Sequence, residues 1–159
     1  MKLIKNTLTA ALAGLALSLS MSAVAYDDAL ADRMNNVTGK MDRAFFTTWT
    51  HIDGKDVLRM QAEGVKFTLV DIRTPEEKAV MALTLPNALS IPLNELFQRT
   101  SLDRLEKLPA DQKILLVCKG GTRSTLASSY LALLGFRNVT FVHGGSDAIV
   151  AALSPRSVK

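Results

Sequence analysis

Short apolar runs alternate with helical patterns between residues 50 and 153, and this alternation limits the possible folds more than any other feature of the chain. The apolar runs are too short for helices and are typical of buried strands. Strands that alternate with helices form right-handed crossovers and a parallel sheet. We therefore predict an α/β fold, with a mostly parallel sheet and helices on both faces. The predicted strands are 50–52, 66–72, 88–91, 113–117 and 139–142.

The segments between these runs have recognisable helix starts and ends. Thr74 followed by Pro75 is a typical helix start, and the two acidic residues after it lie at the positive end of the helix dipole. Gly64 and Gly135 are typical residues just beyond helix ends. Besides the helix that opens at Pro75, the predicted helices are 54–63, with Asp53 as its cap, 101–108, 122–134 and 146–153.

The first 25 of the 159 residues have the pattern of an export signal. Lys2 and Lys5 precede an apolar stretch at 8–19, and the small-x-small pattern of 22–25 predicts cleavage after Ala25. The apolar stretch is too short to span a membrane stably, so we expect no membrane attachment after cleavage. We predict a periplasmic protein, with secretion as the alternative.

Residues 26–49 carry apolar side chains at helical spacing, from Leu30 and Met34 to Phe45. We predict an amphipathic helix, broken near Gly39, that packs on the following domain, with the binding of a partner protein as the alternative. The predicted organisation is a signal peptide (1–25), this helical segment (26–49), one α/β domain (50–153) and a tail (154–159).

Charge and cysteine content exclude several classes of protein. Beyond the signal, 17 Lys and Arg face 15 Asp and Glu with no basic run, which argues against nucleic-acid binding. The single cysteine, Cys118, excludes an internal disulfide and a C-x-x-C pair, and the two histidines lie far apart in the sequence. We predict no metal site and no cofactor.

Cys118 directly follows the predicted strand 113–117, at the sheet edge where such folds bind ligands. Gly120 and Gly121 allow the loop to curl and direct several N–H groups inward. These groups, the dipole of the helix from Thr122, and the charges of Lys119 and Arg123 all favour a negative sulfur. We predict a thiolate nucleophile accessible to solvent, with Arg123 as a fork for an anionic substrate. The alternative is a buried structural cysteine before a turn.

The loop from Cys118 to Ser124 resembles the active-site loop of rhodanese-type sulfurtransferases. The resemblance extends to 69–77, 87–93, 135–136 and 144–145, and covers most of 50–153. It implies a five-stranded parallel sheet flanked by helices, and a Cys118 that cycles between thiol and persulfide. The loop residues Lys119, Gly120, Gly121, Thr122 and Arg123 would then surround the persulfide.

The spacing of the loop separates the branches of this superfamily. Cys118 and Arg123 form C-x4-R, which is similar to the sulfur-transferring branch, whereas the phosphatase branch has C-x5-R. Residues 84–88 and the lack of a Trp after the glycine pair depart from the family pattern and leave the substrate open. Asp71 and Arg73 are predicted to form a structural charge pair, with Glu77 as a candidate third member.

The resemblance implies a thiosulfate sulfurtransferase. Its substrates would be a small anionic sulfur donor and a thiol or cyanide acceptor. The alternative is a noncatalytic module that binds a partner through residues 26–49 and senses oxidants through Cys118. His143, at the end of the last predicted strand, is a weaker candidate for substrate contact.

Overall fold

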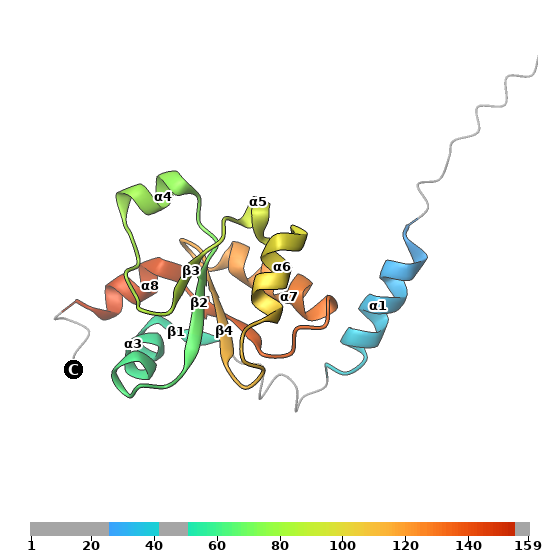
Figure 1. The fold of residues 1–159 in the computed structure, drawn as a ribbon, viewed down its shortest axis with the longest axis horizontal. Helices are drawn as coiled ribbons and strands as arrows, with labels where there is room; N and C mark the ends of the chain where they lie inside the picture. Colours follow the sequence, from blue (N-terminus) through green and yellow to red (C-terminus); the bar gives the residue numbers. More distant parts are fainter. Residues whose placement is uncertain (1–25, 42–50, 155–159) are drawn as a thin grey trace, which may run out of the picture.

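The computed structural model describes residues 26–41 and 51–154 (Figure 1). The predicted signal peptide, residues 42–49 of the predicted helical segment and most of the predicted tail lie outside these residues. None of the helices within the two described ranges is long and apolar enough to cross a membrane.

The described residues form a five-stranded sheet in the order β1-β5-β4-β2-β3. All neighbouring strands are parallel, so the predicted sheet is confirmed. Every residue of β2 is buried, and only the first residue of β4 is exposed, because helices cover both faces of the central strands. The strands are β1 (Ile52–Asp53), β2 (Phe67–Asp71), β3 (Ala88–Ser90), β4 (Lys113–Val117) and β5 (Val139–His143).

The helices that follow residue 51 occupy the predicted positions, with one addition. The short helix α5 was not predicted, because four residues are too few to show a helical repeat. The start predicted at Thr74 is present as a full capping box, in which Thr74 and Glu77 bond each other's backbone N–H. The helices are α3 (Gly54–Ala62), α4 (Pro75–Val80), α5 (Leu93–Leu96), α6 (Arg99–Glu106), α7 (Thr122–Leu133) and α8 (Gly145–Ala152).

Two apolar clusters fill the space between the sheet and its helices. One joins β2, β4 and β5 to α5, α6 and α7, and the other joins the opposite side chains of the same strands to α3 and α8. Figure 1 shows these two groups of helices on opposite faces of the sheet. Because side chains alternate along a strand, each central strand contributes to both clusters. The sheet is therefore held rigidly from both faces, and so are the loops at its carboxyl edge.

The amino-terminal helix α1 (Asp28–Thr38) extends away from this body (Figure 1). Its carboxyl end lies near the end of α7, where the two helices border a cavity of about 290 Å³. The prediction that its apolar stripe packs on the domain is wrong for the first turns, since Leu30 is 47% and Met34 is 45% exposed. Ala31, Val37 and Met41 are half-buried.

Candidate functional site

Cys118 lies at the point where the connections from two adjacent strands, β2 and β4, run toward opposite sides of the sheet. The chain leaves β2 toward β3 on one side, and it leaves the adjacent β4 toward β5 on the other side. Asp71 at the end of β2 pairs in register with Val117 at the end of β4, and Cys118 follows directly. Parallel sheets bind ligands at such a switch point, because the diverging loops leave a crevice between them.

The loop after β4 curls around the sulfur. The backbone N–H of Gly121 donates to Cys118 Sγ at 3.1 Å, and the N–H groups of Arg123 and Ser124 also point to the sulfur. This curl requires a φ of +97° at Gly121, which a side chain would oppose. The Ser124 hydroxyl lies 3.6 Å from the sulfur and 2.8 Å from the Gly121 carbonyl oxygen, and its single proton can be donated to either acceptor. The predicted convergence of N–H groups on one point is present.

Burial and hydrogen bonding act in opposite directions on the Cys118 thiol. Burial raises its pKa, but the hydrogen bonds from the Ser124 hydroxyl and from the backbone of Ser124, Gly121 and Arg123 lower it by more. The net result is a pKa below the ordinary thiol value, as predicted for a thiolate. Its main cause is the set of loop hydrogen bonds.

The prediction that the sulfur is accessible to solvent is wrong for this conformation, because Cys118 is only 1% exposed. The residue belongs to the apolar cluster between the sheet and α7, with Leu116 and Ala127. The inward curl of the loop that supplies the hydrogen bonds also covers the sulfur. A low pKa and burial therefore have one structural origin.

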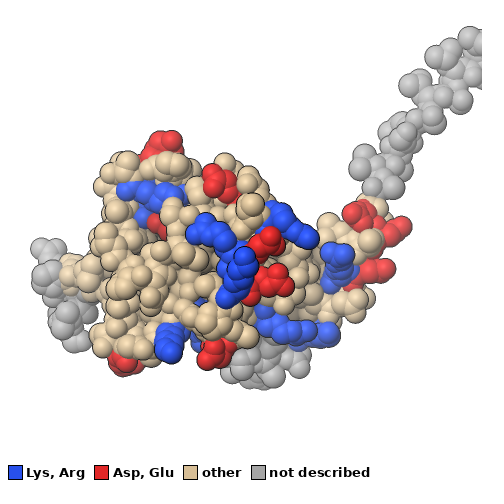
Figure 2. Space-filling view, in the orientation of Figure 1, with Lys and Arg blue, Asp and Glu red and all other residues tan. Residues whose placement is uncertain are grey.

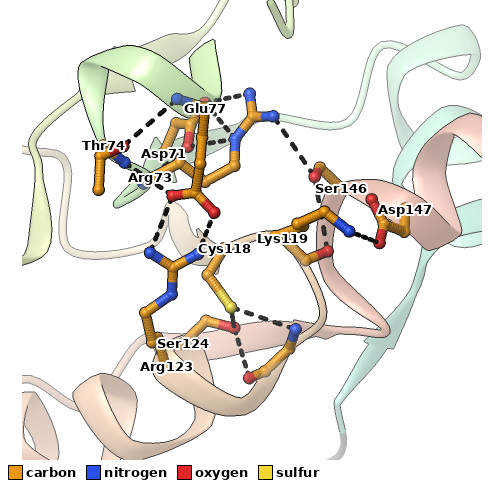
Figure 3. Close-up of polar contacts among 11 residues, drawn as sticks. Asp71, Arg73, Thr74, Glu77, Cys118, Lys119, Arg123, Ser124, Ser146 and Asp147 are labelled. Atoms are coloured by element: carbon orange, nitrogen blue, oxygen red, sulfur yellow. Dashed lines mark hydrogen bonds and ion pairs between the residues drawn. The ribbon is translucent and has the colours of Figure 1, made fainter. Parts of the chain in front are cut away.

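Arg123 does not present a free fork. Its Nη2 lies 2.6 Å from Glu77 Oε1 and its Nη1 lies 2.9 Å from Oε2, so the carboxylate of α4 occupies both arms (Figure 3). The hydrogen bond from Arg123 lowers the pKa of Glu77 to about 2. The same bond raises the pKa of Arg123, and the nearby Cys118 raises it further.

Lys119 is also paired. Its Nζ donates to Asp147 Oδ2 of α8 at 2.9 Å, which raises the pKa of Lys119 (Figure 3). Both side chains are largely exposed, at 64% for Lys119 and 50% for Asp147. The charges that we expected to stabilise the thiolate are thus each balanced by a carboxylate.

The predicted pair of Asp71 and Arg73 is confirmed. Arg73 is 1% exposed and its Nη2 lies 2.7 Å from Asp71 Oδ2. Glu77 pairs with Arg123, so the suggested third member of this cluster belongs to another ion pair. Arg73 Nη1 also reaches the hydroxyl of Ser146 at 3.4 Å and so connects the end of β2 to α8.

A second glycine pair supports the cysteine loop. The N–H groups of Ser146 and Asp147, just after Gly144 and Gly145, donate to the carbonyls of Cys118 and Lys119 at 2.8 and 3.2 Å. A Cβ atom on Gly145 would lie 2.3 Å from both carbonyl oxygens. Ser146 and Asp147 were not among the predicted site residues; the signal in the sequence is the glycine pair that follows β5, the strand beside β4.

The positions of the remaining predicted residues, Gly120, Thr122 and His143, do not by themselves indicate a role in the site. Gly120 has no left-handed backbone angle and open space around its Cα, while Thr122 is the first residue of α7. His143 ends β5, and its ring lies 4.7 Å from that of His51. Residues 26–41 and 51–154 contain no group of three side chains able to hold a metal ion.

Residues 53–152 match the model of the Rhodanese-like domain family. A protein of Allochromatium vinosum named "Sulfurtransferase" is 33% identical over 94 residues, which are 59% of this chain and 81% of that protein. The "Adenylyltransferase and sulfurtransferase uba4" of Ogataea parapolymorpha is 36% identical over 77 residues. That match covers 48% of this chain but only 18% of the yeast protein.

The fold also matches solved structures. A rhodanese-related protein from Thermoplasma volcanium superimposes with a TM-score of 0.53 and 25% sequence identity. The superposition covers 67% of this chain and 96% of the other.

Proposed function

The chain belongs to the family of rhodanese-like domains, and from this membership and the geometry around Cys118 we propose that it is a sulfurtransferase of the thiosulfate type. The donor is thiosulfate or a persulfide, and the acceptor is cyanide or a thiol. The observation that carries the proposal is the convergence of loop N–H groups on the Cys118 sulfur, led by Gly121 N at 3.1 Å. These groups stabilise a negative sulfur without a general base.

The reaction has two steps in this proposal. The Cys118 thiolate attacks the outer sulfur of thiosulfate, a new S–S bond forms, and the old S–S bond breaks with its electron pair leaving on sulfite. The enzyme then carries a Cys118 persulfide whose outer sulfur is negative. Cyanide attacks that outer sulfur, the S–S bond breaks again, and thiocyanate leaves as the thiolate is restored. Both steps conserve charge and need no cofactor.

The loop has a specific role in each step. The backbone from Lys119 to Arg123 encloses the position of the transferred sulfur, and the amino terminus of α7 adds its positive dipole end. Because the side chains of Lys119 and Arg123 are paired with carboxylates, the main chain supplies most of the stabilisation of the persulfide. A donor reaches the buried sulfur only when its outer sulfur enters this loop.

Intact mass spectrometry tests the proposal directly. We expect the mature protein to gain one sulfur atom, about 32 Da, on incubation with thiosulfate or a small persulfide, and to lose it on addition of cyanide. The Cys118→Ser variant keeps the loop and serves as the control, with no gain in mass. The absence of an adduct with every donor would exclude the proposed chemistry.

A noncatalytic partner-binding module is the second candidate, and the exposed apolar side chains of α1 favour it. Such a module would capture a protein through α1 and show negligible turnover despite a reactive thiol. Deletion of residues 26–41 would abolish partner capture but leave the thiol reactive, so capture that needs these residues, together with negligible turnover by the full chain, would favour the module over the enzyme.

We also propose that the protein acts in the periplasm after cleavage behind Ala25. The support is the sequence pattern of residues 1–25. Amino-terminal sequencing of the exported protein should begin at Tyr26. A protein that keeps Met1 in the cytoplasmic fraction would contradict this location.

A further inference from the structure

Each of the two cations in the Cys118 loop is paired with a carboxylate from outside the loop. Arg123 forms a two-armed pair with Glu77 of α4, with distances of 2.6 and 2.9 Å. Lys119 forms a pair with Asp147 of α8, at 2.9 Å. Figure 3 shows the two pairs on opposite sides of Cys118. The loop itself contributes only positive side chains, so both negative charges are additions from other elements of the fold.

These pairs share one electrostatic environment with the sulfur. The negative charge of Glu77 also acts on Lys119, and the charge of Cys118 acts on Arg123. The third cation in the same view, the buried Arg73, is matched by Asp71 (Figure 3). Three cations and three carboxylates therefore surround the sulfur, and their formal charges cancel.

Balanced side-chain charges have a consequence for the donor. The loop N–H groups act at short range on the transferred sulfur, whereas the rest of the donor experiences the field of the side chains. Because the field of the side chains is cancelled, a second negative charge on the donor gains no additional attraction to the site. Without the two carboxylates, Arg123 and Lys119 would attract a donor in proportion to the charge that it carries.

We propose that Glu77 and Asp147 are specificity-determining residues: by neutralising Arg123 and Lys119 they remove the preference for dianionic thiosulfate over a singly charged sulfane donor that the two cations alone would create. This inference rests on the proposed sulfurtransferase function and narrows its substrate class. The two carboxylates act through the field around Cys118 and take no part in bond breaking.

Two donors that differ by one charge isolate this effect. Thiosulfate carries two negative charges and releases sulfite, whereas methanethiosulfonate carries one and releases methanesulfinate. In both reactions the Cys118 thiolate forms an S–S bond with the outer sulfur, and the leaving group takes the electron pair of the broken bond. The ratio of the two KM values therefore reports on the charge of the donor.

The experiment measures kcat and KM of the full chain for each donor, with cyanide as acceptor, at low ionic strength. We expect Asp147→Asn to lower the KM for thiosulfate by about threefold to tenfold, and the KM for methanethiosulfonate by about the square root of that factor. Glu77→Gln should act in the same direction. Because Glu77 also caps α4, the exposed Asp147 provides the variant whose folding is least affected. Added salt should remove the gain in both variants.

Asp103→Asn is the matched control. Asp103 lies on α6 beside Arg99, at 3.8 Å, and borders a cleft with Asn138 at the opposite edge of the sheet from Cys118. Its removal changes the net charge equally and should leave the KM ratio unchanged. Unchanged ratios in both Asp147→Asn and Glu77→Gln would overturn the inference, as would an equal effect of Asp103→Asn. Failure of every donor to form a persulfide would instead refute the sulfurtransferase proposal.

Discussion

Two loops at the carboxyl edge of the sheet have the same construction but different surroundings. Each joins a central strand to a helix through a pair of glycines, Gly120–Gly121 after β4 and Gly144–Gly145 after β5. In the first loop the N–H groups converge on the Cys118 sulfur. In the second they donate to the carbonyls of Cys118 and Lys119, and so they hold the first loop in place.

The difference shows that a glycine pair at a helix start is not sufficient for a binding site. Such a pair supplies inward N–H groups, but the chemistry depends on what lies in front of them. In the second loop those N–H groups are satisfied by backbone oxygens and have no capacity left for a ligand. Its contribution is therefore rigidity, and the first loop depends on it for its shape.

The largest expected effect comes from Gly145→Ala, in the supporting loop. The added methyl would lie 2.3 Å from the carbonyl oxygens of Cys118 and Lys119, at a φ of +62°. We expect a loss of about 3 kcal/mol in the free energy of unfolding, because strain and displacement of the cysteine loop add together. Urea unfolding measures the loss, and persulfide yield should fall with it. A variant of native stability would refute the supporting role.

Gly121→Ala should have a smaller but still clear effect. A methyl at a φ of +97° is strained and would lie 3.0 Å from the backbone nitrogen of Gly144. We expect about 1–2 kcal/mol of destabilisation and a higher pKa for Cys118, since the N–H of residue 121 moves away from the sulfur.

Gly120→Ala is the internal control for that experiment. Residue 120 has no left-handed angle, and a methyl there would meet nothing within 4 Å. We expect stability within about 0.5 kcal/mol of the wild type. Equal effects at 120 and 121 would mean that the glycine pair acts through general flexibility of the loop and not through the curl at Gly121.

The sheet could be predicted from the sequence because it depends on local patterns. The apolar run 113–117 matches β4 at both ends, and the Thr74–Pro75 start of α4 was recognised from its residue types alone. The convergence of N–H groups on Cys118 was also predictable, since it follows from a glycine pair between a strand and a helix.

The partners of the charged residues could not be predicted in the same way. Glu77 lies 46 positions from Arg123, and Asp147 lies 28 positions from Lys119, so only the folded chain brings each pair together. The burial of Cys118 was missed for a related reason. It depends on how tightly the loop closes and on packing against α7, which no local pattern encodes.

The smallest expected effect compares one serine from each loop. Ser124→Ala removes the hydroxyl 3.6 Å from Cys118 Sγ, a group that lowers the pKa of the thiol, whereas the hydroxyl of Ser146 contacts Arg73 and the Lys119 carbonyl. The rate of alkylation by iodoacetamide follows the thiolate fraction, so it falls as the pH drops through the pKa of Cys118. We expect Ser124→Ala to move the midpoint of this pH profile upward, since a hydrogen bond to the charged form is lost. Ser146→Ala should leave the midpoint in place, because its loop acts on the carbonyls of the cysteine loop and not on the sulfur. Equal upward movement in both variants would contradict that division of roles.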